Sequence, residues 1–153
     1  QGVKVALDAS GVALRKGIKA CPDLIKPNEV EAAELLGWEP QDETGAIKAV
    51  EELAQRGVPY VLLTLGKAGA FLGHEGQVWQ GIPPRIEARS TVGCGDSAVA
   101  GMVWALNEGK SLSEAMCWAM AAGATAATTW GTEPGDWETV VRLVDQVKVC
   151  RHI

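Results

Sequence analysis

The stretch Ser90-Thr91-Val92-Gly93-Cys94-Gly95-Asp96-Ser97 runs directly into eleven mostly apolar residues, 98–108, with helical spacing. A Gly-x-Gly turn that opens a helix gathers unpaired backbone amides at the positive end of the helix dipole, which suits a phosphate group. Asp96 adds a carboxylate inside this anion-binding turn. A carboxylate beside a phosphate suits proton transfer, so the stretch favours phosphoryl transfer to a hydroxyl whose proton Asp96 takes.

Residues 93–98 also match the dinucleotide fingerprint Gly-x-Gly-x-x-Ala. That fingerprint requires a strand after the helix, with an acidic residue at its end. An alanine-rich helical segment follows here instead, so the dinucleotide interpretation fails on context. The Walker phosphate loop is absent from the sequence. A simpler alternative, in which Asp96 is only the N-cap of the helix, remains open.

Around this stretch, short apolar segments alternate with amphipathic ones. We expect strands over 3–7, 23–26, 60–65, 70–72, 77–80 and 86–88, and helices over 11–20, 29–36, 44–56, 97–107, 112–129 and 137–147. The Gly-His-Glu-Gly sequence at 73–76 predicts a hairpin turn. This order indicates an α/β layer fold with a largely parallel sheet.

The carboxyl ends of strands in such a sheet are the usual place for a ligand site. Asp8 and the segments 26–28, 64–66 and 93–96 all follow predicted strands. We therefore expect these four segments to share one edge of the sheet.

The composition describes one soluble globular domain. The chain has 153 residues, of which 47% are hydrophobic and 22% charged, and its net charge of −5 argues against a nucleic-acid partner. The uncharged stretch 115–132 is too poor in large apolar residues for a membrane span, so we expect a buried helix there. The four scattered cysteines predict free thiols in a reducing compartment and no zinc site. The opening at Gln1, without Met or signal peptide, suggests a piece of a longer cytoplasmic protein.

Three further groups of residues carry candidate chemistry. Asn28 and Glu31, after Lys26-Pro27, could orient magnesium waters and nucleotide phosphates, although this spacing is also that of a capping box. The segment 64–70 leaves a strand through two glycines, which suits either close approach to a ligand or a tight turn. A helix N-terminus would lower the pKa of the Cys94 thiol, but no histidine is placed to assist it, so we expect a spectator.

Taken in order, Lys-Pro-Asn-x-x-Glu (26–31), Thr-Leu-Gly-x-x-Gly-Ala (64–70) and Gly-x-Gly-Asp-Ser (93–97) resemble the second half of ribokinase-type sugar kinases, the phosphofructokinase B family. The opening Leu-Asp-Ala-Ser-Gly-x-Ala-Leu (7–14) is similar to the branch with 1-phosphofructokinase and tagatose-6-phosphate kinase. The resemblance covers nearly all of residues 1–153. It implies a three-layer α/β/α sandwich, a mostly parallel sheet, and ATP and Mg²⁺ as cofactors.

The resemblance also assigns roles by position. It implies Asp96 as the base that deprotonates the sugar hydroxyl and the amides of Gly93, Cys94 and Gly95 as the anion hole for the γ-phosphate. It places Thr64, Gly66 and Gly69 along the nucleotide, Lys26 and Asn28 near its phosphates, and Glu31 near magnesium. The expected partners are ATP and a sugar phosphate, with a homodimer as the candidate assembly and no nucleic acid or membrane.

The chain departs from the family's pattern in two places. Ser90 stands where many members have Asp, which puts activation by a monovalent cation in doubt, and Cys94 replaces the usual Ala. In the family, the N-terminal half of the fold supplies most sugar contacts and carries the lid. The resemblance does not include that half, so we expect little activity from this chain alone.

Fructose 1-phosphate is the favoured acceptor and tagatose 6-phosphate the second. There are two rival functions. One is a kinase for an unphosphorylated sugar, nucleoside or vitamin, and the other is a non-catalytic nucleotide-binding module. The presence of Asp96 counts against the non-catalytic module.

Overall fold

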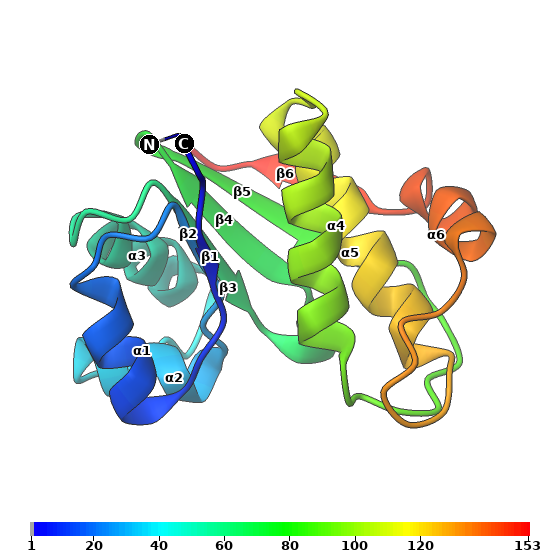
Figure 1. Ribbon diagram of the computed structural model, residues 1–153, viewed down its shortest axis with the longest axis horizontal. Helices are drawn as coiled ribbons and strands as arrows, with labels where there is room; N and C mark the ends of the chain where they lie inside the picture. Colours follow the sequence, from blue (N-terminus) through cyan, green and yellow to red (C-terminus); the bar gives the residue numbers. More distant parts are fainter. Residues whose placement is uncertain (1) are drawn as a thin grey trace. The chain divides into compact units, whose positions relative to one another are not determined.

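The computed structural model describes residues 2–153 (Figure 1). These residues fall into two compact units. The first unit holds the residues up to Gly66 together with 70–79 and 151–153, and the second holds 67–69 and 80–150. The strands form one sheet in the order β1-β2-β3-β4-β5-β6. Helices follow strands through the first unit, which confirms the predicted α/β class.

The strands of the first unit are short and begin the sheet. They are β1 (Ala6–Leu7), β2 (Leu24–Ile25), β3 (Tyr60–Thr64) and β4 (Ala70–His74), with β5 (Gln77–Ile82) starting in this unit. The pairs β1–β2 and β2–β3 are parallel, whereas β4 pairs with β3 antiparallel. The sheet is therefore mixed, because the hairpin adds an antiparallel strand to the parallel part.

The turn between β4 and β5 contains only two residues. Glu75 and Gly76 have φ values of 47° and 75°, as the tight turns favoured in hairpins require. Both strands are consequently longer than the sequence pattern predicts, and Gly73 and His74 belong to β4.

Helices α1 (Gly11–Ile18), α2 (Glu29–Leu36) and α3 (Glu43–Ala54) gather on one side of these strands (Figure 1). Their apolar faces form one cluster with Val61 and Leu63, which alternate along β3 and so share a face. Helix α3 approaches closely because Gly73 on β4 has no side chain: a Cβ there would lie 3.2 Å from the Cβ of Val50. Burial of this cluster is the main stabilisation of the first unit.

The second unit is mostly helical, with α4 (Cys94–Asn107), α5 (Leu112–Ala127), α6 (Trp137–Val144) and most of β6 (Lys148–Arg151). Helices α4 and α5 lie side by side (Figure 1), because a Cβ on Gly101 would come within 2.6 Å of the Trp118 carbonyl oxygen. The alanine-rich α5 is largely buried, as expected. Across residues 2–153, no helix combines the length and apolar character that a bilayer crossing requires.

Several expected element boundaries differ from the structure by a few residues, and three expectations are wrong in kind or by about one helical turn. Residues 86–88 form no strand, since Pro83 and Pro84 remove two backbone donors just before them. Helix α4 begins at Cys94 and not at Ser97, because Gly93 caps it. The last helix ends at Val144, and β6 follows where the sequence pattern suggested more helix.

Candidate functional site

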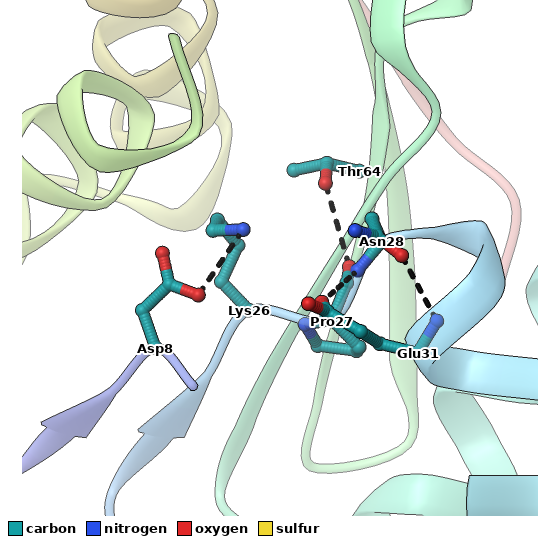
Figure 2. A network of polar contacts seen from close by, with 6 residues as sticks. All are labelled: Asp8, Lys26, Pro27, Asn28, Glu31 and Thr64. Carbon is teal, nitrogen blue, oxygen red and sulfur yellow. Dashed lines mark hydrogen bonds and ion pairs between the residues drawn. The ribbon is translucent and has the colours of Figure 1, made fainter. Parts of the chain in front are cut away.

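Polar contacts join the carboxyl ends of β1, β2 and β3 in the first unit, through one ion pair and through hydrogen bonds to the backbone (Figure 2). Asp8 follows β1 and Lys26 follows β2, and the Lys26 Nζ lies 3.3 Å from the Asp8 Oδ1. Lys26 is only 7% exposed. Lysine is rarely buried without a partner, so the ion pair with Asp8 explains how the fold holds this ammonium group.

Pro27 connects Lys26 to the end of β3. Its carbonyl oxygen accepts hydrogen bonds from the Thr64 amide at 3.0 Å and from the Thr64 Oγ1 at 3.4 Å (Figure 2). Asn28 and Thr64 also form an isolated parallel bridge. The structure therefore brings Asp8, Lys26, Asn28 and Thr64 to one edge of the sheet, as the sequence predicts for this part of the chain.

Asn28 and Glu31 form a capping box at the start of α2 (Figure 2). The Asn28 Oδ1 accepts from the Glu31 amide, and the Glu31 Oε2 accepts from the Asn28 amide, both at 2.9 Å. The capping box, which the sequence offered as the alternative role of these two residues, is thus present. Within the described part of the chain, the Asn28 side-chain NH₂ and the second Glu31 oxygen make no hydrogen bond, so both groups can also serve a ligand.

The carboxylate of Glu31 fits one position of a magnesium site. No group of three or more His, Cys, Asp and Glu side chains that could hold a metal occurs over residues 2–153. Mg²⁺ usually takes one or two carboxylates and completes its octahedron with waters and substrate phosphates. Glu31 would hold such an ion through its second oxygen.

Gly66 and Gly69 differ in what surrounds them. Gly66 has a φ of 56° and is exposed, with no atom within 4 Å of the position of a Cβ. Gly69 is buried with a φ of 101°, and a Cβ there would lie 2.0 Å from the Gly81 carbonyl oxygen. Gly69 is thus required by the backbone of β5, whereas Gly66 leaves open space for a ligand.

The Gly93–Asp96 turn lies in the second unit, at the start of α4. Gly93 is the N-cap, with a φ of 80°, and its carbonyl oxygen accepts from the Ser97 amide at 2.9 Å. Within residues 2–153, the amides of Cys94, Gly95 and Asp96 make no hydrogen bond to another residue. These free donors at a helix N-terminus are what an anion needs.

Asp96 stands in the first turn of α4, three residues beyond the cap. Its side chain is exposed, and the described residues offer its carboxylate no hydrogen bond or ion pair. The alternative in which Asp96 is only an N-cap is therefore wrong, since Gly93 holds that position. A free carboxylate beside free amides can accept a proton from a bound hydroxyl.

Cys94 is held close to the backbone and not presented as a nucleophile. Its Sγ lies 3.7 Å from the Ser90 carbonyl oxygen, and burial raises the pKa of the thiol above its usual range. The expected lowering of this pKa by the helix N-terminus is wrong, because desolvation outweighs it. The spectator interpretation of the side chain fits this geometry.

Ser90 fixes the turn, a role that its position in the sequence motif does not indicate. Its Oγ donates to the Gly131 carbonyl oxygen at 3.1 Å and accepts from the Val92 amide at 3.2 Å. The backbone amides of Arg89 and Ser90 both donate to the Ala127 carbonyl oxygen at the end of α5, at 2.7 and 3.3 Å. The local Ser-x-Val bond is a common serine turn and could have been found from sequence; the contact with Gly131 could not.

The comparisons with known proteins agree with this geometry. Residues 1–139 match the profile of the pfkB family carbohydrate kinases. The 1-phosphofructokinase of Vibrio cholerae is 36% identical over 146 residues, which cover 95% of this chain and 46% of that enzyme. The chain thus spans about half the length of the curated relatives that it matches.

Solved structures give the same result. Phosphofructokinase-2 from Escherichia coli, in complex with potassium, superposes with a TM-score of 0.89 at 31% identity, over 95% of this chain and 48% of that one. Ribokinase from Arabidopsis thaliana, complexed with ribose and ATP, superposes with a TM-score of 0.82 at 30% identity, over 94% and 48%. The fold is therefore ribokinase-like, and the chain belongs to the pfkB family of carbohydrate kinases.

Proposed function

We propose that this chain is the nucleotide-binding and catalytic-base portion of an ATP-dependent sugar-phosphate kinase. The reaction is transfer of the γ-phosphoryl group of ATP to a hydroxyl, with fructose 1-phosphate converted to fructose 1,6-bisphosphate as the favoured case. The name 1-phosphofructokinase among the relatives supports this acceptor. The single observation that carries the proposal is the free carboxylate of Asp96 beside the unpaired amides of the α4 N-terminus.

Asp96 acts as the general base. Its carboxylate accepts the proton of the acceptor hydroxyl while that oxygen attacks the γ-phosphorus, and ADP leaves on the opposite side. The amides of Gly93, Cys94 and Gly95 donate to the equatorial oxygens of the transferred phosphoryl group. The fixed amides need no reorganisation during the reaction, which is why such a turn stabilises the transition state.

The polar edge of the first unit contributes to nucleotide binding. Lys26 supplies a positive charge for the phosphates, while the Asn28 side-chain NH₂ and the Thr64 hydroxyl offer polar contacts to the nucleotide. Gly66 lets the nucleotide approach the backbone, and Gly69 shapes the segment beside it. Mg²⁺, held through Glu31, would neutralise phosphate charge.

We expect little or no kinase activity from the chain of residues 1–153 by itself. Positioning of the acceptor hydroxyl supplies much of the rate in transfers of this kind. The matched relatives are about twice as long as this chain, and their remaining half is the source we expect for the acceptor contacts.

The test joins this chain to the complementary half of the Vibrio cholerae 1-phosphofructokinase and measures ATP-dependent phosphorylation of a panel of sugar phosphates. We expect fructose 1-phosphate to give the highest kcat/KM and the Asp96→Asn variant to lose most of its kcat at the same ATP affinity. Wild-type rates in that variant would show that the base is misassigned. ATP binding by the unfused chain, measured by calorimetry, tests the nucleotide half of the proposal separately.

One alternative to the favoured acceptor has specific support. Tagatose 6-phosphate or an unphosphorylated sugar or nucleoside stands as the alternative acceptor, because a ribokinase and an ATP-dependent 6-phosphofructokinase are also relatives of this chain. The same acceptor panel separates them. A non-catalytic nucleotide-binding module has no use for the free Asp96. ATP binding by the fusion without phosphoryl transfer to any acceptor of the panel would favour such a module. A homodimer remains the assembly that we propose to test by sedimentation.

A further inference from the structure

Asp8 follows β1 and has no role in the reaction proposed above. We propose that Asp8 is a positioning residue, which holds the Lys26 ammonium group in the orientation that receives the nucleotide phosphates. This inference rests on the proposed function of Lys26 as a phosphate contact. It adds a residue that acts through Lys26 and touches neither ATP nor the acceptor.

The register of the parallel strands places the two residues side by side. Leu7 pairs with Ile25, and the Lys26 amide donates to the Leu7 carbonyl oxygen at 3.3 Å. Asp8 and Lys26 are each the next residue after a paired one, so the sheet itself brings their side chains together. The 3.3 Å between the Lys26 Nζ and the Asp8 Oδ1 follows from this register (Figure 2).

Burial makes the pair asymmetric. The Lys26 side chain is 8% exposed, whereas that of Asp8 is 30% exposed. The four-carbon stem of Lys26 is therefore enclosed, and its charged end lies toward a carboxylate that water reaches. A buried ammonium group without a partner is costly, so the carboxylate fixes where this group rests.

Orientation is the main consequence of this pair for a ligand. A free lysine side chain loses rotamer freedom when it binds a phosphate, and this loss weakens binding. Lys26 has already been ordered by the fold and by Asp8, so a phosphate meets an ammonium group that is in place. Loss of the Asp8 carboxylate would leave the buried ammonium group without this partner, so the same ion pair also supports folding.

The experiment measures the affinity of the complete 153-residue chain for ATP and for adenosine by calorimetry. We expect Lys26→Ala to weaken ATP binding about tenfold and Asp8→Ala about fivefold, as the loss of a charge-assisted contact implies. Asp8→Asn keeps an oxygen acceptor for the Nζ, so it should stay within about twofold of the unchanged chain. Adenosine, which lacks phosphates, should bind all four proteins equally.

The double variant Asp8→Ala/Lys26→Ala decides whether Asp8 acts through Lys26. We expect its ATP affinity to equal that of Lys26→Ala alone, since the proposed effect of Asp8 on ATP passes through the Lys26 ammonium group. Losses that multiply in the double variant would overturn the inference. If Asp8→Ala does not fold, Asp8→Ser removes the same contact while keeping a polar side chain, and the same fivefold loss is expected.

Asp42→Ala is the matched control for lost stability. Asp42 caps α3 by accepting from the Gly45 amide at 2.7 Å and makes no contact with Lys26. The Asp42→Ala substitution should lower the melting temperature without changing the ratio of ATP to adenosine affinity. A change in that ratio as large as the one caused by Asp8→Ala would overturn the inference. Failure of the unchanged chain to bind ATP would instead overturn the proposed function, and this inference with it.

Discussion

The polar edge of the first unit and the glycine turn of the second handle their polar groups in opposite ways. At the edge, Lys26 is paired with Asp8, and Asn28 and Glu31 cap a helix together. At the turn, the amides of 94–96 and the carboxylate of Asp96 have no partner among the described residues. Groups that the fold satisfies give orientation and stability, and groups that it leaves unsatisfied are available for a ligand.

The largest expected difference between the two regions is the loss of kcat caused by Asp96→Asn in the glycine turn. In the fusion with the complementary half of a 1-phosphofructokinase, this change should lower kcat about 10² to 10⁴-fold, since amides cannot serve as general bases. The free energy of unfolding should fall by no more than about 1 kcal/mol, because only a helix-dipole contact is lost. Phosphoryl-transfer rates and chemical denaturation check the two numbers.

A kcat within twofold of the unchanged fusion would contradict the role of Asp96 as base. The matched control is Asp136→Asn, since Asp136 caps α6 through the Thr139 amide at 2.8 Å and lies outside the turn. That change should leave kcat unaltered.

Glu31→Gln separates the capping and metal roles of one residue. Glutamine can still accept from the Asn28 amide, so the free energy of unfolding should change by less than about 0.5 kcal/mol. The loss of a charged oxygen should raise the Mg²⁺ concentration needed for half-maximal activity of the fusion about tenfold. A magnesium titration of the fusion measures this concentration. If it does not change, Glu31 acts only in the capping box.

Asn28→Ala probes the satisfied region directly. It removes the acceptor of the Glu31 amide, and we expect the free energy of unfolding to fall by about 1 kcal/mol, as for other N-caps. Urea denaturation monitored by tryptophan fluorescence measures the change. Asn28→Asp retains an acceptor oxygen and should recover most of the loss; equal destabilisation by both variants would contradict the cap.

The smallest effect concerns the pH dependence of the Cys94 thiol. Burial raises its pKa, so the neutral thiol is the form that the fold favours. The stability gained is fully present below the pKa of the unfolded thiol and is lost as the pH rises through the higher folded value. Alkylation by iodoacetamide, followed by mass spectrometry from pH 7 to 10, should modify Cys94 more slowly than the exposed Cys21. Faster reaction at Cys94 would indicate an activated thiol.

Much of the first unit could be predicted because its signals are local. Asn28, Glu31 and Gly37 lie at the two ends of α2, and the predicted helix 29–36 agrees with the structure at both ends. The capping bonds join residues three apart, so the sequence contains both partners. The order of three short motifs likewise gave the family, which the comparisons confirm.

Strands were harder to predict because their partners are distant in sequence. Residues 86–88 have an apolar alternation but no neighbouring strand, whereas 148–151 form β6 despite their exposed side chains. A two-residue strand such as β1 exists only because β2 lies beside it. Whether such a segment forms a strand depends on its pairing with a neighbouring strand and not on its β-propensity alone.

The sequence by itself determined the two ends of α2, the Gly-x-Gly-Asp turn and the family, because each depends on residues close together in the chain. Only the tertiary structure decided that Asp8 pairs with Lys26, that Ser90 reaches Gly131, and that Gly69 makes room for the backbone of Gly81. The physical reason is that these contacts depend on strand register and close packing. Both are set by the burial of the whole core, which no local pattern records.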